Sequence, residues 1–277
     1  FLRAQMYTEF YYMITTQCNQ RCSKCSHWKK KDDAPRQPPQ KMIEAIKALP
    51  GLCDLIIVGG EPLLFKDEIL KIIKGIAATP VRTVLISNGV ALSSEFIDEI
   101  KDYKIHIVVS IDTMDCNFWK FVRGVDSYNL VMKNLEYAIH TLSPYQISLQ
   151  SVLAEETKAF VPEVKKFADA HGLYHSVQNF IAEGFDGSWT PIKTSEIPFS
   201  RDAQQCFAAD RNLSVMQNGD VYTCFQQSWI KGFERPLGNL NTTPIEQIIS
   251  SPYAQAVQEA MRKCNKSCKE LKCNLKR

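Results

Sequence analysis

Residues 53–112 decide the fold, and their sequence is CDLIIVGGEPLLFKDEILKIIKGIAATPVRTVLISNGVALSSEFIDEIKDYKIHIVVSID. Three short β-rich runs, at 53–58, 81–87 and 104–111, are separated by segments in which apolar residues have helical spacing. Strands joined by helices of this length must run parallel, with right-handed crossovers. The stretch therefore predicts the repeating strand-helix unit of an open α/β sheet or an α/β barrel.

The same alternation continues on both sides of this stretch. Further strands are predicted at 11–16, 146–153 and 174–181. Helices are predicted at 41–49, 67–77, 93–102, 127–142 and 158–171. Six such units fit in about 180 residues, whereas a closed eight-unit barrel usually takes roughly 250. We therefore expect an α/β fold of the partial (β/α)6 TIM-like barrel type.

The alternation of strands and helices ends at a long connecting segment, residues 184–205, which is rich in Gly, Pro, Ser and Thr. We place a domain boundary there, with a barrel at 1–190 and a smaller domain at 191–277. In the smaller domain, the Asn-Gly pair at 218–219 lies between two short β-rich runs, which is typical of a hairpin. A short helical stretch near 244–262 follows, so a hairpin-plus-helix domain is expected.

The composition narrows the class of protein. The chain has 277 residues, of which 45% are hydrophobic, and a formal net charge of only +3. These values favour a globular core and argue against a disordered tail or a histone-like nucleic-acid binder. No apolar run approaches the roughly 18 residues of a membrane span, and the first residues lack the apolar stretch of a signal peptide. We expect a soluble, cytoplasmic protein without a nucleic-acid or membrane partner.

Eight of the ten cysteines fall in two groups, which are Cys18, Cys22 and Cys25, and Cys206, Cys224, Cys264, Cys268 and Cys273. Clustered cysteines in a chain of this size, without a secretion signal, favour metal ligands over disulfides. Three thiolates on one loop suit an iron-sulfur cluster or zinc, but a zinc site needs a fourth ligand nearby, and His27 is the only close candidate. Three ligands on a four-iron cluster leave one iron open for another molecule.

Polar motifs follow the first four predicted strands. After the cysteine loop come Gly59, Gly60, Glu61 and Pro62, then Asn88 with Gly89, and then Ser110 with Asp112. Each motif alone is explained as a turn. In a parallel sheet, however, these strand ends share one edge, the rim, where α/β folds build their sites. Taken together, the motifs therefore predict one site at the rim.

The segments CNQRCSKC, GGEP, SNG, SID and FVRGVDSYNLVMKNLEYA together resemble the radical S-adenosylmethionine (SAM) superfamily over nearly the whole chain. The resemblance implies that Cys18, Cys22 and Cys25 hold a [4Fe-4S] cluster whose open iron binds SAM. It assigns Gly59, Gly60, Glu61 and Pro62 to the SAM amino group, Asn88, Ser110 and Asp112 to the ribose, and Arg123 or Lys133 to the SAM carboxylate. It also implies a flavodoxin- or ferredoxin-type reductant.

One residue departs from the family pattern. The residue before the third cysteine is commonly aromatic in the superfamily and contacts adenine, whereas here it is Lys24. Trp28 is a candidate replacement, although a Trp at that place is equally suited to packing the loop against the barrel.

The second cysteine group resembles the SPASM or shorter twitch extension, which holds auxiliary iron-sulfur clusters. Its pattern is Cys206-x12-Gly219-x4-Cys224, followed by Cys264, Cys268 and Cys273. Five cysteines are too few for two full clusters, so the resemblance implies one auxiliary [4Fe-4S] cluster with one cysteine to spare. Cys53 and Cys116 have no cysteine nearby and are interpreted as ordinary thiols.

The implied reaction is reductive cleavage of SAM to a 5'-deoxyadenosyl radical, which abstracts hydrogen from a substrate C-H bond. No segment of about 80 to 100 residues is left for a separate peptide-recognition domain. This favours a small polar metabolite of the sugar or aminocyclitol type. A maturase of ribosomally made peptides is the alternative, and a non-catalytic iron-sulfur or zinc protein is a more distant one. Candidate residues between the domains are Tyr174, His175, Gln178, Glu183, Asp186, Trp189 and Asp210.

Overall fold

The computed structural model describes residues 7–31, 34–181, 189–192 and 206–264. In this part of the chain, nine strands form one sheet in the order β6-β5-β4-β3-β2-β1-β7-β8-β9. The barrel strands are β1 (Glu9–Thr15), β2 (Asp54–Gly59), β3 (Arg82–Ser87), β4 (Ile105–Ser110), β5 (Ile147–Leu153) and β6 (Tyr174–Asn179). The others are β7 (Asn212–Met216), β8 (Asp220–Tyr222) and β9 (Gly238–Asn239).

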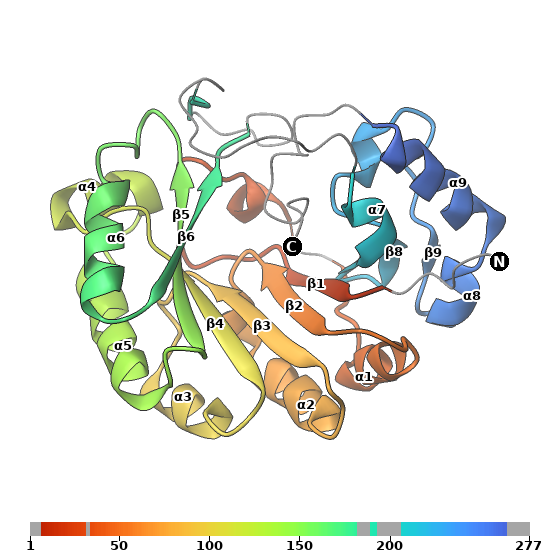
Figure 1. Ribbon diagram of the computed structural model, residues 1–277, viewed down its shortest axis with the longest axis horizontal. Helices are drawn as coiled ribbons and strands as arrows, with labels where there is room; N and C mark the ends of the chain where they lie inside the picture. The colour runs from red at the N-terminus through yellow and green to blue at the C-terminus, as the bar shows by residue number, and fades with distance from the viewer. Residues whose placement is uncertain (1–6, 32–33, 182–188, 193–205, 265–277) are drawn as a thin grey trace.

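Strands β1 to β6 are all parallel and curve into a barrel that stays open (Figure 1). The helices between them cover the convex face: α1 (Pro39–Lys47), α2 (Lys66–Ile76), α3 (Ser94–Ile100), α5 (Tyr128–Thr141) and α6 (Val161–Ala170). The predicted partial barrel is confirmed, and its six strands and five helices lie within a few residues of the predicted ranges.

Burial alternates along the barrel strands, as expected for a sheet with two different faces. Leu55, Ile57, Leu85 and Ile107 are 0% exposed because they face the helices. The residues between them on the same strands face the concave side, and several, such as Ile86, are only partly buried. The helix-facing side chains therefore form the core, and the concave face is left for a ligand.

A helix that the sequence analysis missed, α4 (Cys116–Arg123), follows β4. Asp115 caps it, because its carboxylate accepts hydrogen bonds from the backbone N-H groups of Asn117 (2.7 Å) and Phe118 (3.1 Å). Gly124 ends it in the left-handed conformation, with φ of 67°. Both residues are ordinary helix signals, but the segment is only eight residues long and is rich in aromatic and β-branched residues, which weaken its helical pattern.

The predicted helical stretch near 244–262 is two helices, α8 (Ile245–Ile249) and α9 (Pro252–Arg262). Pro252 cannot continue α8 but suits the first position of α9, and Ser251 caps α9 through the backbone N-H of Ala254. A short helix, α7 (Ala208–Arg211), was also missed. Three 3-10 turns complete the described elements: η1 (His27–Lys29), η2 (Pro62–Phe65) and η4 (Gln227–Trp229).

The C-terminal part continues the barrel sheet. Strand β7 pairs in parallel with β1, and β8 pairs antiparallel with β7 to form the predicted hairpin, which turns through Gly219 (φ 89°). The main core includes residues of both parts, such as Phe10 and Leu213. The division at residues 190 and 191 remains a prediction. Among the described helices, none has the length and apolar character to cross a membrane.

Candidate functional site

The cluster loop, residues 18–28, begins just after β1 and contains the first three cysteines. Its backbone turns toward their sulfur atoms: the N-H of Gln20 lies 3.4 Å from Cys18 Sγ, and the N-H of His27 lies 3.5 Å from Cys25 Sγ. Burial raises the pKa of the Cys18 thiol to about 11 and also raises the pKa of Cys25. Without a metal these thiols stay protonated, so metal binding must displace their protons.

The donor set, three thiols on one short loop, suits a four-iron cluster. Cysteines on such a cluster bind different irons, and three of them leave the fourth iron open. Cys22 is buried, while Cys18 and Cys25 are half-buried. The loop therefore offers three thiols at a sheltered but accessible place.

The GGEP segment after β2 packs against the chain that enters the cluster loop. The N-H of Gly60 donates to the carbonyl of Thr15, and the N-H of Glu61 donates to the carbonyl of Gln17, both at 2.8 Å. A Cβ atom on Gly60 would lie only 2.0 Å from the Gln17 carbonyl oxygen. Glycine is therefore required there by the close approach of two backbones.

The Glu61 side chain joins two segments of the rim and is fully buried. One carboxylate oxygen accepts from the Ser87 hydroxyl (2.8 Å) and the Leu63 N-H (3.0 Å), and the other accepts from the Asn88 N-H (2.8 Å). Burial raises the pKa of Glu61, and these hydrogen bonds oppose the rise. Pro62, next to it, begins η2 and is buried. Glu61 thus holds the end of β2 to the end of β3.

Asn88 connects the end of β3 to the cluster loop. Its side-chain amide donates to Asn19 Oδ1 at 2.7 Å and lies 3.7 Å from Cys18 Sγ. The side-chain oxygen of Asn88, Oδ1, accepts from the N-H of Val90 at 3.0 Å. Hydrogen bonds thus join Glu61 to Asn88 and Asn88 to Asn19, so they connect the GGEP segment to the residue that follows the first cysteine.

The end of α4 supports the other side of the cluster loop. The N-H of Arg21 donates to the Arg123 carbonyl (2.9 Å), and the N-H of Ser23 donates to the Val122 carbonyl (3.2 Å). A Cβ atom on Gly124 would lie 2.3 Å from the Arg21 carbonyl oxygen, so this contact also requires glycine. The helix that was missed from sequence is therefore a direct support of the cysteine loop.

Three residues that the sequence analysis did not single out, Gln20, Ser127 and Trp119, help to hold this loop. Gln20 is 0% exposed, and its amide donates to the Ser127 hydroxyl at 3.1 Å. The Trp119 indole N-H donates to the same hydroxyl at 3.1 Å. The only sequence signal for Gln20 was a polar residue between two cysteines, and nothing nearby indicated that Ser127 would be its partner.

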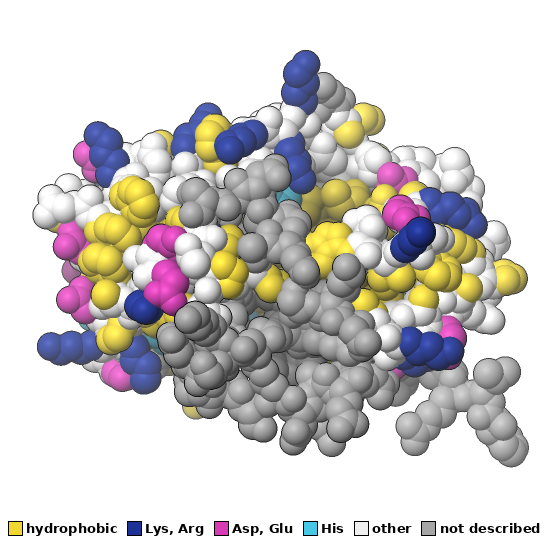
Figure 2. All heavy atoms as spheres, turned by 90° about the horizontal axis from the view of Figure 1, so that it is seen from above, with side chains coloured by type: hydrophobic (Ala, Val, Ile, Leu, Met, Phe, Trp, Pro, Cys, Tyr) yellow, Lys and Arg dark blue, Asp and Glu magenta, His cyan; other side chains and the backbone are white. Residues whose placement is uncertain are grey.

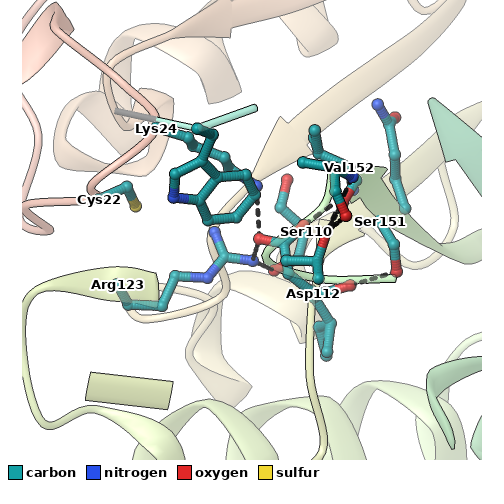
Figure 3. A network of polar contacts seen from close by, with 12 residues as sticks. Cys22, Lys24, Ser110, Asp112, Arg123, Ser151 and Val152 are labelled. Carbon is teal, nitrogen blue, oxygen red and sulfur yellow. Dashed lines mark hydrogen bonds and ion pairs between the residues drawn. The ribbon is translucent and has the colours of Figure 1, made fainter. Parts of the chain in front are cut away.

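A buried network of charges lies beside the cluster loop (Figure 3). Asp112 forms ion pairs with Lys24 and, at 3.0 Å, with Arg123, and its second oxygen accepts from the N-H of Val152 at 2.8 Å. Arg123 also donates to the Ser110 carbonyl at 2.5 Å. Burial alone would raise the pKa of Asp112, but the two cations outweigh it and lower that pKa. Asp112 is therefore an ionised carboxylate between two cations.

The other candidates lie in different surroundings. Lys133 is exposed on α5. Cys206 is 6% exposed and belongs to the main core, Cys224 packs against that core, and Cys264 follows α9. Cys268 and Cys273 lie outside the described residues, as do Glu183 and Asp186. Cys53 and Cys116 are exposed.

Of the remaining candidates, Trp189 lies against the cluster loop. Its indole N-H donates to the Ser23 hydroxyl at 2.8 Å, and the Lys24 ammonium lies 4.9 Å from the ring centre. His175 bonds to Ser151 at 2.8 Å, and Gln178 bonds to Gln150 at 3.0 Å. Tyr174 is exposed, and Asp210 pairs with Arg262 at 2.6 Å, away from the loop.

Comparison with known protein families supports an iron-sulfur site at this position. Residues 12–158, more than half of the chain, match the Radical SAM superfamily, and residues 206–274 match the iron-sulfur cluster-binding domain SPASM. A probable GTP 3',8-cyclase of Pyrococcus abyssi is 29% identical over 139 residues, which are 49% of this chain and 45% of that protein. The chain thus spans about half the length of this relative.

Two solved structures have the same fold. Streptococcus suis SuiB, bound to the precursor peptide SuiA, has a TM-score of 0.72 at 14% identity over 98% of this chain and 70% of SuiB. The protein anSMEcpe, with bound AdoMet (SAM) and the Cp18Cys peptide, has a TM-score of 0.70 at 14% identity over 97% of this chain and 88% of its own. The matched domains imply SAM, a [4Fe-4S] cluster and an auxiliary iron-sulfur cluster as cofactors. The chain belongs to the radical SAM superfamily.

Proposed function

We propose that this chain binds SAM at a [4Fe-4S] cluster on Cys18, Cys22 and Cys25 and abstracts hydrogen from a C-H bond of an uncharged polar substrate, with a peptide as the first candidate. The observation that carries the proposal is the fixation of the cluster loop. Three separate parts of the rim hold it in place: the GGEP segment, Asn88 and the end of α4. Such preorganisation is what a cluster that must position SAM requires.

When bound, SAM and the reduced cluster supply a 5'-deoxyadenosyl radical. The chain supplies the surroundings. In the proposal, the backbone of Gly59 and Gly60 faces the SAM amino group, and Glu61 holds that backbone in place through its three hydrogen bonds. Asn88 and Ser110 contact the ribose. The Trp189 indole excludes water from one side of the loop, being itself only 4% exposed.

The roles of the charged residues follow from their partners. Both Asp112 oxygens accept bonds from protein groups, so we assign Asp112 to positioning Lys24 and Arg123 rather than to a direct ribose contact. Arg123 is buried against the cluster loop, where its carbonyl accepts from the N-H of Arg21, whereas Lys133 is exposed on α5. This favours Arg123 as the cation on the side of the SAM carboxylate.

The concave face favours an uncharged substrate. In the carboxyl-terminal half of the barrel strands, alternation directs Met13, Val58, Ile86, Ser110, Gln150, Val152 and Gln178 to this face, and all are uncharged. A nucleoside triphosphate would need several cationic partners. The two buried cations beside the cluster loop, Lys24 and Arg123, are held by Asp112, and the proposal assigns Arg123 to SAM, so neither is left for a triphosphate. Figure 2 shows hydrophobic and uncharged side chains over much of the described part of this face. This argues against a nucleotide substrate for this chain, although the relative is named as a GTP 3',8-cyclase.

A peptide is preferred because the two similar structures described above contain a bound peptide. The anSMEcpe structure holds a bound peptide, and this chain covers 88% of that protein. A separate recognition domain is therefore not a requirement for peptide binding in this fold, so chain length does not decide between a peptide and a small metabolite. The Gln150 and Gln178 amides could pair with peptide groups. Hydroxyl groups would suit the same amides, so a small polar metabolite stays the second candidate.

For the C-terminal part, we propose one auxiliary cluster held by Cys206 and Cys224 with two of Cys264, Cys268 and Cys273. The reductant for both clusters would be a flavodoxin- or ferredoxin-type protein. The total iron content tests the first point, because two [4Fe-4S] clusters give about eight irons per chain. A value near four that does not change when Cys206 and Cys224 are replaced would contradict the auxiliary cluster.

Isotope transfer tests the substrate class. The anaerobically reconstituted protein is reduced with dithionite and incubated with SAM and one of three deuterated materials: a protein digest, a mixture of sugars and aminocyclitols, or GTP. We expect deuterium in the 5'-deoxyadenosine only with the digest. Transfer only from sugars or aminocyclitols would establish the second candidate, and transfer from GTP would refute the uncharged substrate. If no 5'-deoxyadenosine forms at all in a protein with full iron content, the reaction itself is refuted.

A further inference from the structure

Three charged side chains, Lys24, Asp112 and Arg123, form a buried charge triad beside the cluster loop (Figure 3). Their exposed fractions are 14%, 1% and 3%. The triad contains two cations and one anion, so its net charge is positive. Buried charges interact strongly because little water screens them. With Lys24 paired to Asp112, the triad therefore places a positive net charge in a sheltered position next to the metal ligands.

The triad is held rigidly. Asp112 is fixed from behind by the N-H of Val152 (2.8 Å), and Arg123 is fixed by the Ser110 carbonyl (2.5 Å). The Trp189 ring covers the Lys24 ammonium at 4.9 Å from its centre. These contacts prevent the two cations from moving toward water to lower their energy. Their effect on a nearby charge is thus built into the fold.

The triad also reaches the metal ligands. The residues on either side of Cys22 are bonded to the end of α4, because the N-H of Arg21 donates to the Arg123 carbonyl and the N-H of Ser23 donates to the Val122 carbonyl. Cys22 also lies two residues before Lys24. A four-iron cluster on three thiolates has a negative net charge, and one-electron reduction adds another negative charge. A positive neighbour stabilises the reduced form more than the oxidised form. Net charge is among the factors that set the potentials of such clusters.

We propose that the charge triad raises the reduction potential of the cluster on Cys18, Cys22 and Cys25, with Lys24 and Arg123 favouring the reduced form and Asp112 limiting their effect. The inference rests on the proposed cluster site. It gives a purpose to the one departure from the family pattern, because a cation replaces the usual aromatic residue at position 24. A cluster that is easier to reduce accepts an electron from a weaker reductant.

The test is a redox titration of the anaerobically reconstituted chain, followed by electron paramagnetic resonance. The signal of this cluster is distinguished from that of the auxiliary cluster by its change when SAM is added. In Lys24→Met, we expect the ratio of reduced to oxidised cluster at the wild-type midpoint to fall at least tenfold, a shift of about 59 mV for one electron. Asp112→Asn should shift the midpoint in the opposite direction, because it removes the only negative charge of the triad.

Two control variants isolate the buried charge. Lys30→Met removes the same charge from an exposed residue near the loop and should change the ratio less than threefold. Lys24→Arg keeps the charge and should stay close to the wild type. A midpoint in Lys24→Met equal to that in Lys30→Met, or shifts of the same sign in Lys24→Met and Asp112→Asn, would overturn the proposal.

Iron content and circular dichroism separate this result from a failure of the cluster site. A variant with full iron and an unchanged midpoint contradicts the charge triad alone. A wild-type chain that binds no SAM-responsive cluster contradicts the proposed function instead. If Asp112→Asn does not fold, the comparison of Lys24→Met with Lys24→Arg decides the question, since only the first removes charge.

Discussion

The two groups of cysteines differ in how the chain brings them together. The first group occupies an eight-residue stretch, from Cys18 to Cys25, and local backbone turns bring its members together. The second group extends from Cys206 to Cys273, so its members depend on pairing between distant segments, such as β7 with β1 and with β8. The first can be recognised by spacing alone. The second is a site only if the whole C-terminal part folds.

The surroundings of the two groups differ as well. The cluster loop lies at the rim, where polar groups such as Asn88 contact it. Cys206 instead belongs to the main hydrophobic core, which also contains Leu213 and Val215. A buried thiol there behaves as a small apolar side chain. Replacing a cysteine of the first group should therefore lower the activity more than the free energy of unfolding. Replacing Cys206 of the second group should also disturb the packing of the core.

The largest expected effect tests the first group. Cys22→Ala removes a ligand of the proposed cluster, so the rate of SAM cleavage should fall by at least about a thousandfold. A loss of this size is known from enzymes in which a single electrostatic group of the active site is removed. The measurement is 5'-deoxyadenosine formed per chain by the reduced protein. Cys53→Ala is the matched control, because Cys53 is exposed and lies away from the rim. Equal activity in the two variants would refute the assignment of this loop.

The next effect separates the two groups by function. In a Cys206→Ala, Cys224→Ala double variant, 5'-deoxyadenosine should still form slowly without substrate, while product formation is lost or severely reduced. The reason is that only the first cluster contacts SAM in the proposed reaction. Circular dichroism and thermal melting check that the variant is folded, since a metal often stabilises a small unit. A folded variant with wild-type product yield would leave these cysteines a purely structural role.

A third prediction compares two glycines with the same backbone conformation. Gly124 (φ 67°) lies against the cluster loop, whereas Gly172 (φ 66°) has no atom within 4 Å of an added Cβ. Gly172→Ala should lower the free energy of unfolding by about 1 kcal/mol, the usual strain of this conformation. Gly124→Ala should lower it by about 3 kcal/mol, because the new Cβ also meets the Arg21 carbonyl. Urea denaturation measures both, and equal losses would contradict the loop contact.

The sequence was sufficient for the barrel and for the first cysteine group. Alternation of burial with period two, and helices between the strands, follow from local patterns that a single sequence displays. The rim motifs were predictable for a similar reason, because a parallel sheet places all strand ends at one edge. The close approach of Gly60 to Gln17 agrees with this expectation.

What the sequence could not provide depends on contacts between distant residues. The pairing of β7 with β1 has no local signal, since it joins segments about 200 residues apart, so the continuous sheet was not foreseen. The contacts of Lys24 with Asp112 and Trp189 likewise join residues that are far apart in the sequence. The charge triad emerged only once the elements that contain it were packed together.

The smallest expected effect tests the contact that joins the two regions. Tyr7 precedes β1, which leads to the first cysteines, and its buried hydroxyl accepts a 2.6 Å hydrogen bond from Gln258 on α9, close to Cys264. Tyr7→Phe leaves that buried amide without its acceptor, so the free energy of unfolding should fall by about 1 to 2 kcal/mol near pH 8. Tyr145→Phe, at a residue that is 89% exposed, should change it by less than about 0.5 kcal/mol.

The pH dependence of this loss distinguishes the buried phenol from simple packing. Burial raises the pKa of Tyr7 to about 12, against an ordinary value of about 10. Above pH 10 the unfolded chain therefore releases this proton while the folded chain retains it, so the stability that Tyr7 contributes is complete below pH 10 and is lost as the pH rises toward 12. Tyr7→Phe has no such proton. The difference in the free energy of unfolding between wild type and variant should therefore shrink by about 1.4 kcal/mol between pH 8 and pH 11. Urea denaturation at pH 8, 10 and 11 measures it. A difference that stays constant over this range would show that the Tyr7 hydroxyl is not buried against α9, and that the two cysteine regions are not joined at this point.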